Sequence, residues 1–415
     1  MGQGSGRALQ FPDFRRILQA RGLLAFALQF QSVVIGWQVY QLKGEALYLG
    51  LIGLTEAIPA IIGALIAGHW IDNSRPARLL QGSLILLATN TFGIWCAVNP
   101  GFGFSASTRL ALLFVGIFIS GAGRSFASPS ALALVPQILP REELSRAAAL
   151  NSSVFTTAQI TGPALGGLIF GWLGAPIAFA VPVGVALAAC VSSLQLSPAT
   201  LQLTGRKLTH PPEPILISIL GGWRFLRQHH VLLATMALDM FSVLFGGTVA
   251  VLPIFADQVF HVGAHGLGFL RAAPAVGSLV VSVFLATRPF KVISGSVLLI
   301  AIAGFGLSIV GFAATQQFQL ALFFLAFSGA CDGINMIIRG TLTQLLTPDH
   351  MRGRVLSLSS VFITSSNEIG ALESGLAATA MGLIPSVVFG GVMTLVIVLV
   401  VNVSVPELRR TRIQS

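Results

Sequence analysis

Apolar runs of about 20 residues recur along almost the whole chain, which is the length needed to cross a bilayer as a helix. Of the 415 residues, 54% are hydrophobic and only 9% are charged, fewer than a soluble protein of this size carries. Backbone polar groups in lipid must be satisfied within their own segment, so these runs form helices. The sequence therefore predicts an all-α polytopic membrane protein.

Twelve transmembrane helices can be marked, and the prolines divide them into two sets of six. The segment between the sets carries Pro198, Pro211, Pro212 and Pro214, followed by a predicted amphipathic helix at 215–227. We expect an N-terminal six-helix bundle at 1–195, a cytoplasmic linker at 196–230 and a C-terminal six-helix bundle at 231–415. The predicted spans are 22–42, 47–71, 77–98, 108–134, 149–173, 175–195, 231–254, 264–287, 292–314, 317–341, 355–380 and 384–405.

Basic residues alternate between the two sides of the predicted membrane. Cytoplasmic loops are enriched in Lys and Arg, and with both termini cytoplasmic the outer segments hold only Lys43 and Arg109. Because the basic residues lie between the apolar runs, the net charge of +10 reflects the orientation of a membrane protein and does not indicate nucleic-acid binding. The inner basic residues are Arg7, Arg15, Arg16, Arg21, Arg75, Arg78, Arg141, Arg146, Arg206, Lys207, Arg224, Arg227, Arg288, Lys291, Arg339, Arg352, Arg354, Arg409, Arg410 and Arg412.

The chain contains an internal duplication. The Ser-Gly-Ala pattern at Ser120 recurs 208 residues later at Ser328, and the Ser-Ser-Val-Phe pattern at Ser152 recurs at Ser359. Internal repeats separated by half the length of an apolar chain are common in secondary transporters. Charge differs between the copies at three pairs, which are Gln29 and Asp239, Glu56 and Arg271, and Arg124 and Asp332.

Several ordered motifs make the whole chain similar to the major facilitator superfamily, and within it to the branch of the enterobactin exporter and the macrolide-type efflux pumps. They are Gly36-Trp37-Gln38-Val39-Tyr40, Gly68-His-Trp-Ile-Asp72 with Arg75 and Arg78, Gly162-Pro163-x-x-Gly166-Gly167, Leu238-Asp239-Met-Phe, Thr347-Pro348-Asp349 with Arg352 and Arg354, and Ser366-Asn367-Glu368. The resemblance implies two pseudo-symmetric six-helix bundles in the inner membrane of a bacterium.

The same resemblance implies roles for two of these motifs. Gly68, Asp72, Arg75, Arg78, Arg352 and Arg354 would form a cytoplasmic latch. Gly162, Pro163, Gly166 and Gly167 would form a helix-bend motif between the halves, because glycines at four-residue spacing let helices approach closely and proline interrupts the helix. A plain packing groove and ordinary surface ion pairs remain the alternatives.

Seven ionisable side chains fall at membrane depth, where each is costly and therefore a functional candidate. Counting about 1.5 Å per residue predicts two layers. The inner layer holds Gln29, Arg124, Asp239 and Asp332, and the outer layer holds Glu56, Arg271, Glu368 and Glu373.

These layers suggest gates that protons operate. We expect Arg124 to pair with Asp332 or Asp239, and Arg271 with a glutamate. Protonation of a carboxylate would release its arginine. Asp239, Asp332 and Glu368 are the proton-coupling candidates, and Arg124, Glu56, Arg271 and Glu373 are the gate candidates; permanent structural ion pairs are the alternative.

A polar stripe at helical spacing is the candidate lining of a substrate cavity. It comprises Gln29, Ser32, Tyr40, Ser242 and Phe245, and helix packing is the alternative interpretation. The sequence contains no Gly-Lys dipeptide and hence no phosphate-binding loop, so we expect no ATP, no cofactor, no metal and no enzyme site.

The predicted function is secondary active export of a small organic molecule, a siderophore or a drug-like compound, by proton antiport with alternating access. The expected partners are the lipid bilayer, the substrate and protons, with no nucleic acid, and the protein is expected to be a monomer. A lysophospholipid or lipid flippase of the same fold and a non-transporting membrane sensor remain open.

Overall fold

A computed structural model of the chain describes residues 6–72, 74–204, 223–287 and 292–414. It divides into two compact units. The first comprises Met1–Leu42, Thr55–Pro212 and Ala264–Gly268, and the second comprises Lys43–Leu54, Glu213–Gly263 and Phe269–Ser415. Much of the predicted linker, 205–222, lies outside the described residues.

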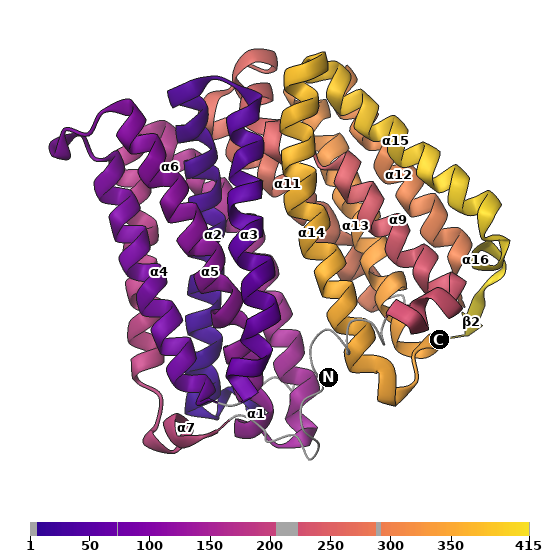
Figure 1. The fold of residues 1–415 in the computed structure, drawn as a ribbon, viewed down its shortest axis with the longest axis horizontal. Coiled ribbons are helices and arrows are strands. Elements are labelled where there is room, and N and C mark those ends of the chain that lie inside the picture. Colours follow the sequence, from indigo (N-terminus) through magenta and orange to yellow (C-terminus); the bar gives the residue numbers. More distant parts are fainter. Residues whose placement is uncertain (1–5, 73, 205–222, 288–291, 415) are drawn as a thin grey trace. The chain divides into compact units, whose positions relative to one another are not determined.

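The helices of the first unit run from indigo to magenta in Figure 1. They are α1 (Gly6–Leu9), α2 (Pro12–Lys43), α3 (Ala46–Asp72, whose first residues belong to the second unit), α4 (Pro76–Val98), η1 (Pro100–Phe102), α5 (Ala106–Ile138), η2 (Arg141–Glu143), α6 (Leu144–Leu194) and α7 (Pro198–Gln202).

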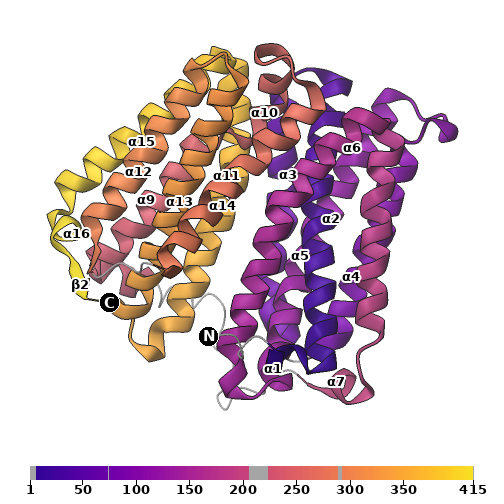
Figure 2. The ribbon, with the colours of Figure 1, turned by 180° about the vertical axis from the view of Figure 1, so that it is seen from behind.

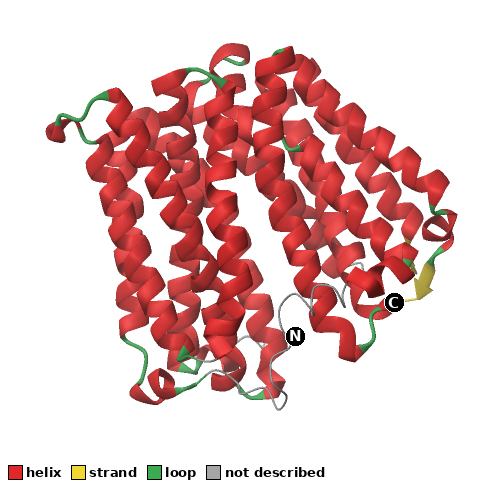
Figure 3. Ribbon diagram, viewed as in Figure 1, coloured by secondary structure: helices red, strands yellow, loops and turns green. Residues whose placement is uncertain are grey.

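The second unit is also helical, and its α9, α12 and α13 pack together (Figure 2). Its elements are α9 (His230–Gly246), η3 (Thr248–Val251), α10 (Leu252–Ile254), the π-helix η4 (Phe255–Val259), α11 (Gly263–Thr287, which begins in the first unit), β1 (Val292–Ser294), α12 (Gly295–Ala314), α13 (Phe318–Leu346), α14 (Asp349–Met381), α15 (Leu383–Ser404), α16 (Pro406–Arg410) and β2 (Arg412–Gln414). The two short strands pair antiparallel, and helices make up nearly all the rest (Figure 3).

Ten helices within the described residues are long and apolar enough to cross a membrane. One of them, α6, covers two predicted spans and is interrupted at Gly174, whose φ of 75° is a conformation that favours glycine. Large apolar side chains such as Trp172, Ile300 and Val403 are at least 67% exposed, which suits contact with lipid. The predicted polytopic helical membrane fold is confirmed.

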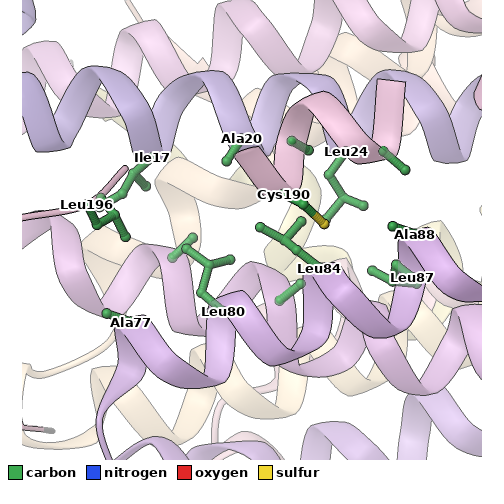
Figure 4. Close-up of a cluster of buried hydrophobic side chains, with 14 of the residues drawn as sticks. Ile17, Ala20, Leu24, Ala77, Leu80, Leu84, Leu87, Ala88, Cys190 and Leu196 are labelled. Carbon is green, nitrogen blue, oxygen red and sulfur yellow. The ribbon is translucent and has the colours of Figure 1, made fainter. Parts of the chain in front are cut away.

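The first unit is held together by interlocking leucines and alanines. Leu80, Leu84 and Leu87 of α4 lie at helical spacing and are nearly inaccessible, and they pack against Leu24 of α2 and Cys190 of α6 (Figure 4). Small residues let the helices approach, while the leucines fill the space between them. The three helices thereby share one buried apolar core.

The internal duplication is visible in the packing of each unit. In the first unit, a Cβ on Gly121 would lie 2.9 Å from Cγ of Pro59. In the second unit, a Cβ on Gly329 would lie closer still to the backbone of Pro274. The two glycines are 208 residues apart in sequence, so equivalent residues make equivalent helix contacts.

One predicted span differs from the structure. The span 231–254 was expected to be continuous, but α9 ends at Gly246, and η3, α10 and η4 follow. Gly247 has a ψ of 78°, which is not helical, and consecutive glycines weaken a helix. The interruption leaves backbone carbonyls for side chains to bind.

Candidate functional site

Polar side chains form a stripe along one face of α13 in the second unit. Asp332, Asn335 and Arg339 are spaced three and four residues apart, which places them on the same side of a helix. Asn335 and Arg339 are 4% and 9% exposed. Buried polar groups at this depth need partners, and the neighbouring helices supply them.

Asp239 of α9 is the centre of this polar cluster. Asn335 Nδ2 donates to Asp239 Oδ1 at 2.6 Å, and Arg339 Nη2 lies 3.5 Å from Asp239 Oδ2. Arg339 Nη1 also donates to Ser359 Oγ of α14 at 3.2 Å. The carboxylate is only 5% exposed, so its charge is balanced inside the unit by Arg339.

Asp332 is held more loosely. The same Asn335 Nδ2 donates to Asp332 Oδ1 at 3.3 Å, and Asp332 is only partly buried. Asn335 therefore bridges two carboxylates, one on α9 and one on its own helix. We call Asp239, Asp332, Asn335 and Arg339 the carboxylate cluster.

The sequence analysis found the two aspartates but not their partners. Arg339 is buried on α13, which continues to Leu346; the sequence analysis counts it among the inner basic residues and not among the candidates, and its placement on the cytoplasmic side stays a prediction. The spacing of Asp332, Asn335 and Arg339 on one helix face was the signal that could have revealed the cluster.

In the first unit, Arg124 of α5 forms an ion pair with Glu56 of α3, and 2.9 Å separates Nη1 from Oε1. The sequence analysis expects Arg124 to pair with Asp332 or Asp239. Within the first unit the structure pairs it with Glu56, and the expected pairing with the aspartates stays a prediction. The sequence analysis also placed Arg124 and Glu56 in different layers, which is wrong. Counting residues from helix ends assumes that all spans start at one height and run parallel, and the ion pair shows that this assumption fails for α3 and α5.

The Arg124–Glu56 pair depends on close packing between α3 and α5. A Cβ on Gly121, one turn before Arg124, would lie 2.7 Å from the carbonyl oxygen of Glu56. Both charged side chains keep some exposure, 39% for Arg124 and 26% for Glu56. The pair is therefore reachable from outside the packed interior, unlike Asp239.

The interruption after α9 is bound by side chains from two other helices. Ser374 of α14 donates to the carbonyl of Gly247 at 2.7 Å, and Arg271 of α11 lies 3.5 Å from the carbonyl of Val249. Glu368 and Glu373 lie partly buried on α14. The expected pairing of Arg271 with a glutamate stays a prediction.

The candidate cavity residues lie on α2 and α9. On α2, Gln29 and Ser32 are partly buried, and Tyr40 is buried against Trp37. On α9, Ser242 is buried beside the carboxylate cluster, and Phe245 contacts Phe389 edge-on. Ser242 is thus brought to the cluster, and the role of the others stays a prediction.

The helix-bend motif is buried on α6. A Cβ on Gly162 would lie 2.8 Å from Cβ of Gln29, and one on Gly166 would lie 3.0 Å from the carbonyl oxygen of Phe30. Pro163 and Gly167 are also buried. These two glycines let α6 pack on the backbone of α2.

The cytoplasmic latch can be followed only in part. Arg75 and Arg78 are exposed at the start of α4. The side chains of Asp72, Arg352 and Arg354, and the surroundings of Gly68, lie outside what the structure describes. The latch stays a prediction.

Repeated membrane-crossing helices with charged groups buried between them define a multi-pass membrane transporter of the major facilitator type. A family model described as "Transmembrane secretion effector" matches residues 7–415. The chain belongs to this family.

Similar proteins agree with this membership. The enterobactin exporter EntS of Escherichia coli O1:K1 / APEC is 25% identical over 405 residues, covering 97% of this chain and 94% of the relative. EntS of Salmonella choleraesuis (strain SC-B67) is 26% identical over the same coverage.

Solved transporter structures share the fold. A mutant of the nucleoside transporter NupG aligns with a TM-score of 0.74 at 12% identity, covering 95% of this chain and 100% of that one. A bacterial homologue of the iron transporter ferroportin, in an inward-facing state, gives a TM-score of 0.70 at 18% identity, covering 96% and 99%.

Proposed function

We propose that the protein exports a small organic molecule, a siderophore or a drug-like compound, across the bacterial inner membrane by proton antiport. Family membership and the similarity to proteins named enterobactin exporter support export. In this proposal the halves 1–195 and 231–415, joined by the cytoplasmic linker 196–230, alternate access to one binding site. The protein acts as a monomer with both termini cytoplasmic.

The observation that carries the coupling is the carboxylate cluster. Two aspartates share Asn335, and within the described part of the second unit one arginine, Arg339, is paired with them through Asp239. Maintaining such charges in a membrane is costly, which favours a task for them. A proton on Asp239 removes the partner charge of Arg339 and frees its guanidinium, a change that can bias two conformations. Glu368 on α14 is the further proton-coupling candidate.

Uptake into everted membrane vesicles tests this function. Radiolabelled enterobactin, the substrate named for the EntS relatives, and a labelled macrolide are offered with and without an imposed pH gradient. We expect gradient-dependent accumulation of one of these classes of compound. A labelled lysophospholipid in the same vesicles tests the flippase alternative.

Neutral variants then test the coupling residues. Asp239→Asn and Asp332→Asn should reduce gradient-driven uptake to the level of vesicles without the protein, at normal amounts in the membrane. Asp257→Asn is the matched control, because Asp257 is an exposed carboxylate on η4 of the same unit. Undiminished uptake by both cluster variants would defeat the coupling proposal.

A further inference from the structure

A small cavity lies directly beside the carboxylate cluster in the second unit. Ser242 of α9, Asp332 and Asn335 of α13, and Ile302 and Phe305 of α12 line it. Its free volume of about 10 Å³ is close to what one water-sized particle needs. The cavity is therefore too small for an organic substrate but large enough for a single ion.

Two buried oxygens at this cavity have no hydrogen-bond partner among the described residues. They are Asn335 Oδ1 and Ser242 Oγ, and each residue is only 4% exposed. Asn335 Nδ2 is committed to Asp239 and Asp332, which leaves the amide oxygen free to bind another group. Buried acceptors without partners are costly, so they indicate a ligand that the protein binds.

Among the described residues nearest the cavity, the ionised charges do not cancel. When both carboxylates are ionised, Asp239 and Asp332 carry two negative charges against the one positive charge of Arg339, and the α12 residues that line the cavity, Ile302 and Phe305, are apolar. Asp239 is the carboxylate that contacts Arg339. One negative charge, that of Asp332, is left at the cavity wall and would be balanced by one monovalent cation.

The donor atoms select the kind of cation. A carboxylate, an amide oxygen and a hydroxyl are hard oxygen ligands, as alkali and alkaline-earth ions prefer. Cys331 also lines the cavity, but within the described residues no group of three His, Cys, Asp or Glu side chains could hold a metal ion. A divalent ion would leave an excess positive charge beside Arg339.

We propose that Asp332, Asn335 and Ser242 form a binding site for one sodium ion. The ligands are the Asp332 carboxylate, Asn335 Oδ1 and Ser242 Oγ, and Asp239 with Arg339 hold Asn335 in position. The site goes beyond the proposed function, and the sodium ion and the proton of that function would compete for the carboxylate of Asp332.

Equilibrium binding of radioactive sodium to the purified full-length protein tests the site, with no substrate and no gradient present. We expect saturable binding that sodium chloride displaces and choline chloride does not. Asp332→Asn should weaken sodium affinity about tenfold or more, and Asn335→Ala should do likewise, as for groups that hold or position a metal ligand. Absence of saturable binding in the wild type would overturn the proposal.

Two serine variants complete the experiment. Ser242→Ala removes one hydroxyl and no charge, so it should fold and should weaken sodium binding several-fold; unchanged affinity would count against the site. Ser328→Ala is the matched control, because this buried serine of α13 already donates to Leu325 O at 2.7 Å. Wild-type affinity is expected for that control, and an equal loss in both serine variants would overturn the assignment.

The outcome is separable from that of the proposed function. Proton-driven export without sodium binding overturns the site alone. Sodium binding without export of any offered compound overturns the exporter proposal alone.

Discussion

Replacing Arg339 by methionine removes the positive charge from the carboxylate cluster while keeping a side chain of similar length. Arg339 Nη2 lies 3.5 Å from Asp239 Oδ2, and the two side chains are 11% and 7% exposed. Breaking such a buried pair from one side costs about 3–5 kcal/mol, because the remaining charge is uncompensated. Here the loss is aggravated by Asp332, the second carboxylate that shares Asn335.

The cost should fall when the partner charge is removed as well. The double variant Asp239→Asn with Arg339→Met leaves no isolated charge at that position, and Asn preserves the shape of the carboxylate. We expect the double variant to be less destabilised than the sum of the single variants, with a coupling of about 2–3 kcal/mol. The free energy of unfolding is measured for the wild type, the two single variants and the double variant by detergent titration of the purified protein in mixed micelles.

Arg16→Met is the matched control. Arg16 Nη1 pairs with Asp13 Oδ1 at 3.1 Å, but Arg16 is 31% exposed, and Asp13 keeps hydrogen bonds from Ser197 and Thr200. A partly exposed pair between residues three apart on one helix is worth about 1 kcal/mol or less. The reasoning is refuted if Arg339→Met costs no more than Arg16→Met, or if the coupling is below about 0.5 kcal/mol.

Three further changes separate packing, gating and anchoring. Gly166→Leu should destabilise the protein by about 1–3 kcal/mol through overpacking against α2, whereas Gly184→Leu should not, since nothing lies within 4 Å of its Cβ position; detergent unfolding compares them. Glu56→Gln should change stability by less than about 1 kcal/mol, because its partner Arg124 is 39% exposed, and yet reduce uptake by everted vesicles; wild-type uptake would argue against a gate. Asp13→Ala should lower the free energy of unfolding by about 1–3 kcal/mol, because it removes the acceptor for the hydroxyls of Ser197 and Thr200 at the start of α7. It should also speed proteolysis at α7, and unchanged cleavage would show that Asp13 does not hold this helix in place.

Sequence reasoning located the ionisable residues but could not pair them. Glu56, Arg124, Asp239 and Asp332 stand out because charges are rare in apolar spans. The sequence did not identify their partners, since Arg124 contacts Glu56, which was expected in a different layer. A count of residues from a helix end gives depth along one helix only, and tilt and unequal helix length decide which side chains meet.

The end of α13 shows a second limit. The sequence analysis counts Arg339 only as one of the inner basic residues, whereas the structure buries it on α13, which continues to Leu346. A polar face can remain helical and buried when another helix supplies its partners, as α9 does with Asp239. Composition along one segment cannot report the partner on another segment.

The sequence by itself determined the class of protein, because long apolar runs with few charges can satisfy their backbone hydrogen bonds in a membrane only as helices. The internal repeat also indicated two halves built alike, which agrees with the similar packing at Gly121 and Gly329. Only the tertiary structure decided which charges neutralise each other and which oxygens are left for a ligand. The reason is physical. Backbone hydrogen bonds in a helix are local and can be read along the chain, whereas the pairing of Asp239 with Arg339 joins residues 100 positions apart and depends on how two helices pack.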